Sequence, residues 1–75
     1  MKNYQFTAQI ELDTESGMYV GIIPGLPGAH SQAKTLDELQ VRMLEVIELC
    51  ITNLNEDELK SLPKFIGVQQ YSIAV

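Results

Sequence analysis

The sequence has few of the residues that build catalytic or metal centres. It contains one cysteine, Cys50, and one histidine, His30. A single cysteine excludes an intrachain disulfide and favours a reducing compartment, and there is no cluster of His and Cys to bind zinc. His30 lacks a positioned nucleophile, because Ser31 follows it on an expected strand and points to the opposite face. We therefore expect no metal, no cofactor and no enzymatic activity.

Basic residues and long apolar runs are also scarce. Five Lys and Arg oppose ten Asp and Glu, for a formal net charge of −5. Nucleic-acid binding needs a basic surface, so we expect no direct nucleic-acid partner. An acidic chain favours a basic protein partner, although the charge also serves solubility alone. No apolar run reaches the length of a membrane span and the chain opens "MKNYQF", without an apolar leader, so we expect a cytoplasmic protein.

The first third of the chain predicts two strands. Apolar and polar residues alternate over 4–13, which is typical of a half-buried strand. "TESG" follows and predicts a hairpin loop with Gly17 at positive φ. "MYVGIIP" predicts a second strand that Pro24 ends, because proline cannot donate to the ladder.

The rest predicts a short strand, a helix and a last strand. "AHSQAK" is the short strand, and Thr35 with Glu38 predicts a capping box that begins the helix. The expected buried face of the helix is Leu36, Leu39, Met43, Val46, Ile47, Cys50, Ile51 and Leu54. A connector with one helical turn precedes Pro63, and "FIGVQQYSIAV" predicts a strand with a bulge or edge position near Gln69 and Gln70. The order β-β-β-α-β over one domain, 1–75, predicts an α+β fold: a small antiparallel sheet with one helix packed on one face.

The bend "PGLPG" at 24–28 has two interpretations. Its glycines and prolines set turn geometry in both. In the first, Leu26 is an exposed anchor that binds a partner together with Pro24, Pro27 and His30. In the second, Leu26 folds back to cover the thin core. A phosphate-binding loop is excluded, because the prolines remove two of the backbone N–H groups that such a loop needs.

The carboxylates do not form the cluster that a two-metal nuclease needs. Glu11 and Asp13 lie at one end of the first expected strand, and Glu45 and Glu48 lie on the helix away from its apolar face. Two apolar helix residues, Val41 and Leu49, also fall outside that face. They are scattered surface residues or part of a contact surface.

The stretch "PGLPGAHSQAKTLDEL" followed by "MLEVIEL" resembles the HicB-like antitoxin domain. A strand ending in proline, an LPG turn, a small polar strand and Thr-Leu-x-Glu opening a helix occur in that order. The matching positions are Pro24, Leu26, Pro27, Gly28, Thr35, Leu36, Glu38, Glu45 and Ile47. The resemblance covers roughly the whole chain and is most specific between Tyr19 and Glu48. The chain resembles the HicB-like domain without the DNA-binding extension that many relatives carry. The resemblance implies a truncated RNase H-like fold without catalytic acids.

The resemblance implies a non-enzymatic antitoxin that binds and neutralises a small basic HicA-type mRNA-cleaving toxin. The alternatives are a stand-alone structural or regulatory oligomer of the same fold with no toxin, and a degenerate nuclease. A thin core favours self-association as a homodimer or larger. The expected interface residues are Val41 and Leu49 on the helix, or Tyr71 and Ile73 on the edge of the last strand.

Overall fold

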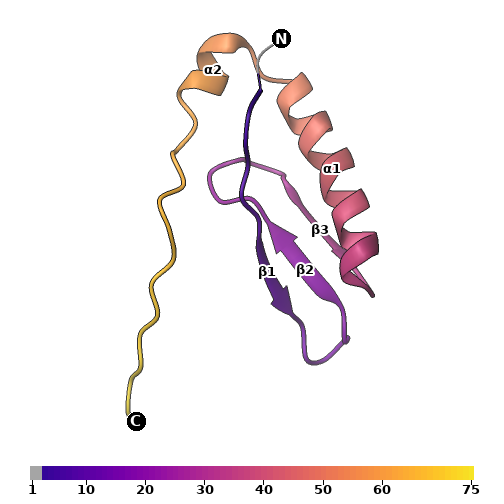
Figure 1. The fold of residues 1–75 in the computed structure, drawn as a ribbon, viewed down its shortest axis with the longest axis vertical. Coiled ribbons are helices and arrows are strands. Elements are labelled where there is room, and N and C mark those ends of the chain that lie inside the picture. The colour runs from indigo at the N-terminus through magenta and orange to yellow at the C-terminus, as the bar shows by residue number, and fades with distance from the viewer. Residues whose placement is uncertain (1–2) are drawn as a thin grey trace.

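Three short antiparallel strands and two helices make up the fold. The computed structural model describes residues 3–75, with β1 (Gln9–Leu12), β2 (Tyr19–Ile22), β3 (His30–Ala33), α1 (Leu36–Thr52) and α2 (Glu56–Lys60). The sheet order is β1-β2-β3, and α1 packs against β3 and β2 (Figure 1). The predicted α+β class and the β-β-β-α order are confirmed.

The register decides which residues share a face of the sheet. Leu12 lies opposite Tyr19, which lies opposite Ala33. This row faces α1, because Ala33 is fully buried in the core beneath the helix. The neighbouring row, which includes Val20, therefore points to the other side of the sheet, where no helix packs.

The paired part of β1 is shorter than the predicted strand over 4–13. The pairing of β1 with β2 begins only at Gln9, which lies opposite Ile22 at the end of β2. The next residue of the second strand, Ile23, donates its N–H to the Ala29 carbonyl instead (2.9 Å). Residues 3–8 consequently have no strand to pair with, although Phe6 and Ala8 still pack against the core.

The predicted hairpin between β1 and β2 is confirmed. Gly17 has a φ of +73°, and its N–H donates to the Asp13 carbonyl (2.8 Å). The Ser16 hydroxyl donates to Asp13 Oδ2 (2.6 Å) and lowers the pKa of that carboxyl. This hydrogen bond between two side chains of the turn stabilises the exposed hairpin loop.

Helix α1 begins as predicted, but with half of the predicted capping box. Thr35 Oγ1 accepts from the Glu38 N–H (3.1 Å). The Glu38 carboxylate pairs with Arg42 on the next turn (2.6 Å) instead of returning to the cap. The complete capping box lies at α2, where Asn55 and Glu58 each accept the other's backbone N–H.

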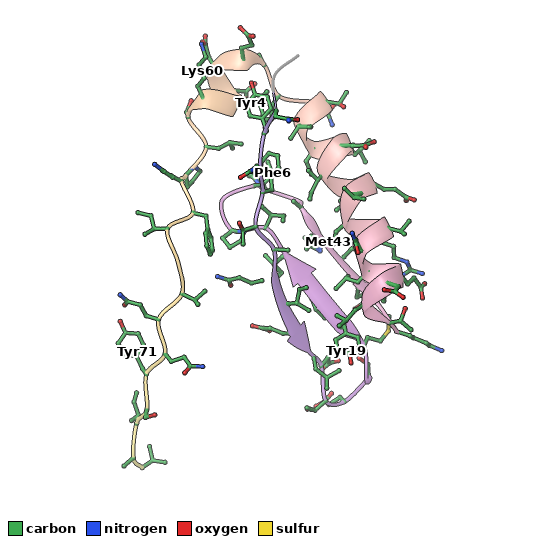
Figure 2. The ribbon with its side chains drawn as sticks, viewed as in Figure 1. Tyr4, Phe6, Tyr19, Met43, Lys60 and Tyr71 are labelled. Atoms are coloured by element: carbon green, nitrogen blue, oxygen red, sulfur yellow. The ribbon has the colours of Figure 1, made fainter. Side chains whose placement is uncertain are left out.

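The core lies between α1 and the β2–β3 half of the sheet. Figure 2 labels Met43, which comes from α1 and is buried there. The buried residues are Ile23, Leu26, Ala29, Ala33, Leu39 and Met43. The predicted buried face of α1 is correct except at its first position, because Leu36 is 52% exposed.

The predicted last strand is wrong for the single chain. Residues 64–75, called the C-terminal tail from here on, follow α2 as an extended segment without strand pairing. The tail runs down the β1 side of the molecule but stands apart from it (Figure 1). Its apolar residues change parity at Gln69 and Gln70, so no single face of the tail can pack on the sheet along its whole length.

Candidate partner-binding surface

The bend between β2 and β3 is closed by its own backbone. The Leu26 N–H donates to the Ile23 carbonyl (3.2 Å), and the Ala29 N–H donates to the Leu26 carbonyl (3.1 Å). These turns fold the tip of the bend back onto the helix, and Leu26 is 4% exposed. The structure thus corrects the prediction of an exposed Leu26 anchor: the side chain covers the core, as the second interpretation stated.

The other predicted partner-binding residues are on the surface but do not form one cluster. Pro24, Pro27 and His30 are all exposed. Pro24 lines a hollow with residues 4–7 and 62–65, whereas the Pro27 carbonyl accepts from the Cys50 thiol of α1 (3.5 Å). His30 lies on the face of the sheet away from α1, in the row with Ile22.

Two adjoining hollows run along the outer side of β3. One, of about 390 Å³, is lined by Val20, His30, Ser31, Gln32 and Arg42. The other, of about 380 Å³, is lined by Ser31, Arg42, Glu45, Val46 and Leu49. Because both include Ser31 and Arg42, they form one continuous surface, the β3 flank, from His30 to Leu49. A predicted partner residue and a predicted interface residue therefore share it.

Arg42 lies in the middle of the β3 flank, and its positive charge is already paired within the chain. Its Nη1 donates to the Gln32 carbonyl (2.7 Å), and its Nη2 pairs with Glu38 (2.6 Å). The guanidinium is thereby committed to its own chain. Glu45 lies one helical turn further along the same flank and supplies its negative charge.

The solvent side of α1 continues the flank with apolar and acidic residues. Val41 and Leu49 are 57% and 66% exposed, which fits both a contact surface and scattered surface residues. Leu44, at 56% exposed, was missed by the sequence analysis. Its spacing of three residues from Val41 on the helix is the signal that could have found it. Glu48 lies among these residues, and the surface suits a partner with basic and apolar side chains.

The carboxylates of the described residues do not converge. Glu11 is on the sheet face away from α1, in the row of Val20, and Asp13 is tied to Ser16 in the hairpin. Within residues 3–75 no three His, Cys, Asp or Glu side chains lie together in a way that could hold a metal ion. The placement gives no support to a two-metal nuclease site.

The predicted interface residues of the last strand lie on the C-terminal tail. Tyr71 and Ile73 are 80% and 82% exposed, and Tyr71 stands away from the sheet and the helices (Figure 2). The C-terminal tail lies beyond the β1 edge of the sheet, whereas the β3 flank lies at the opposite edge (Figure 1). The predicted interface residues thus fall on two separate exposed regions, one at each edge of the sheet.

No helix among residues 3–75 has the length and apolar character needed to cross a membrane. The chain is similar to three proteins named UPF0150 protein. It is 46% identical over 70 residues to one from Synechocystis, covering 93% of this chain and 96% of that protein. It is 47% identical over 68 residues to one from Archaeoglobus fulgidus, covering 87% and 88%. It is 36% identical over 75 residues to one from Thermotoga maritima, covering 97% of each. No protein-family profile and no solved structure matches.

Proposed function

The chain belongs to the UPF0150 family, and on that premise we propose that it is a non-enzymatic HicB-like antitoxin. It binds and neutralises a small basic HicA-type mRNA-cleaving toxin. The resemblance of residues 19–48 to the HicB-like domain supports this proposal. The family name itself states no activity or partner, so the argument rests on the residues and the surface.

The observation that carries the proposal is the composition of the β3 flank and the adjoining side of α1. Exposed Leu49 and Leu44 provide apolar contact area, and Glu45 and Glu48 provide negative charge. A basic toxin meets a complementary field there, which speeds encounter and selects the partner. His30 at the other end of the flank can donate to or accept from a partner group.

Co-expression with a toxin tests the proposal. The probe is the small basic HicA-type reading frame beside this gene, expressed with and without the chain. We expect the chain to restore growth and to form a stable complex with the toxin. Absence of such a reading frame, or a toxin that neither binds the chain nor is neutralised by it, would show that the antitoxin proposal is wrong.

Charge reversal on the flank tests the surface separately. Glu45→Lys combined with Leu49→Lys should weaken toxin binding at least about tenfold, because it removes an apolar contact and places like charges against the toxin. Glu15→Lys, in the hairpin on the far end of the sheet, is the matched control and should bind as the unaltered chain does. Equal affinity of all three proteins would place the toxin surface elsewhere.

A second function has support from the C-terminal tail. Its exposed apolar residues favour a stand-alone oligomer of the same fold with a structural or regulatory role and no toxin. This alternative shares the assembly developed below and differs from the antitoxin only in the absence of a toxin partner. The co-expression experiment distinguishes the two.

A further inference from the structure

The end of the C-terminal tail has the pattern of a strand without a sheet. Tyr71 and Ile73 share one side of the extended chain, and Ser72 points to the other. The two apolar side chains are at least 80% exposed. A segment with one apolar side and unpaired backbone groups gains most by joining the edge of a sheet whose neighbouring side chains are also apolar.

The outer edge of β1 offers such a place. β1 pairs with β2 on one side only, and the contacts of α1 are with β3 and β2. Ile10 and Leu12 point to the α1 side of the sheet but do not belong to the core cluster, and they are 53% and 54% exposed. The β1 edge therefore has both free backbone groups and uncovered apolar side chains.

The opposite edge of the sheet is less accessible. Arg42 donates to the Gln32 carbonyl on β3 (2.7 Å), and α1 packs along the same strand. An added strand would have to displace the guanidinium from that carbonyl. The β1 edge is therefore the better site for an added strand.

The size of the isolated chain shows that it has surface to bury. Its radius of gyration is 14.4 Å, against about 11 Å for a compact domain of this length. Its accessible surface is 6462 Å², against about 4,600 Å² for a compact monomer of this mass. The excess of about 1,800 Å² is more than the roughly 800 Å² that each partner contributes to a standard interface.

We propose that a second copy of this chain covers the β1 edge. Residues 70–75 of each copy pair along β1 of the other, and Tyr71 and Ile73 pack beside Ile10 and Leu12. Each copy carries one tail and one free β1 edge, so the exchange is reciprocal and closes as a two-fold dimer. This inference does not depend on the proposed antitoxin function.

The direction of the tail distinguishes exchange from docking in the same chain. The tail and β1 run the same way along the molecule (Figure 1), so pairing within one chain would be parallel, which is slightly less stable per residue than antiparallel pairing. A second copy can present its tail antiparallel to β1.

Light scattering of the full chain is the first test. We expect twice the mass of one chain at tens of micromolar protein. Ile73→Lys should shift the mass to that of a monomer, because it places a charge against Ile10 and Leu12. The matched control Ser72→Lys adds the same charge on the other side of the tail and should remain a dimer. A monomeric unaltered chain, or an Ile73→Lys dimer, would overturn the proposal.

Cross-linking separates exchange from docking within one chain. In a Cys50→Ser background, one chain carries Glu11→Cys and a second chain carries Ser72→Cys, and the two are co-expressed and oxidised. Glu11 lies on the side of the sheet away from α1, and the proposed pairing of the tail would place Ser72 on that side too, within reach of a disulfide. We expect a covalent heterodimer. Absence of that product, together with a cross-link inside single chains that carry both cysteines, would contradict the proposal.

Discussion

The residues up to the end of α2 and the C-terminal tail contain the same kinds of apolar side chain in opposite surroundings. Leu26 is 4% exposed, whereas Ile66 is 90% exposed. The difference is not one of hydrophobicity. Leu26 has α1 opposite it, and two turns hold it there, whereas Ile66 has no facing layer in the single chain. Burial thus depends on a second element at the right distance, which an apolar pattern alone does not supply.

An aspartate placed in the core and an aspartate placed in the C-terminal tail should differ most in their effect on the free energy of unfolding. Leu26→Asp should lower the free energy of unfolding by on the order of 4 kcal/mol, because it removes an apolar core side chain and buries a carboxyl group. Ile66→Asp should change it by less than about 0.5 kcal/mol. Urea denaturation followed by circular dichroism, at protein dilutions low enough to exclude assembly, measures both.

The opposite outcome for Leu26 would be informative. A Leu26→Asp chain that keeps its stability but no longer binds a HicA-type toxin would restore the interpretation of Leu26 as a partner anchor. A chain that keeps both would leave the bend with a purely geometric role.

A smaller contrast tests the junction between the two regions. Gly25 has a φ of +84°, and a methyl group added there would lie 2.9 Å from Pro63 Cγ. Gly17 has a φ of +73° and open space around it. Both alanine variants should lose about 1–2 kcal/mol to backbone strain, and Gly25→Ala should lose about 1 kcal/mol more through the contact. Equal losses in urea denaturation would show that Pro63 moves aside freely.

The smallest expected effect is a pH dependence of the hairpin. The Ser16 hydroxyl lowers the pKa of Asp13 below its ordinary value of 3.8. The folded pKa is depressed, so this stabilisation is present above about pH 4 and is lost as the pH falls through the lowered pKa. The difference in unfolding free energy between the unaltered chain and Asp13→Asn should therefore shrink in acid. A difference for Asp13→Asn that is constant from about pH 6 to about pH 2 would contradict this.

The sequence predicted the elements that are stabilised locally. The alternation around β1, the Thr35 cap and the apolar face of α1 each carry their own signal, and all three are present in the structure. The predicted return of the Glu38 side chain to the cap is wrong, because Arg42 competes for its carboxylate and that geometry exists only once the helix has formed.

Long-range placement was harder to predict from the sequence. The β3 flank joins His30 and Leu49, which are nineteen positions apart and meet only through Ser31 and Arg42. The last strand was predicted from propensity at residues 65–75, but strand formation needs a neighbouring edge, and the single chain does not provide one. The buried position of Leu26 likewise depends on two turns closed by backbone hydrogen bonds. The amino-acid composition of the bend does not specify these bonds.

The bond from Arg42 to the Gln32 carbonyl has a consequence for aggregation. A sheet that accepts strands at both edges can add chain after chain and grow into a fibre. Here a guanidinium from the same chain is bonded to a backbone carbonyl at one edge, so a new strand joins the other edge more readily. An assembly built on that edge fills it once and leaves a third chain only the edge that Arg42 guards, which favours a small closed particle over a filament.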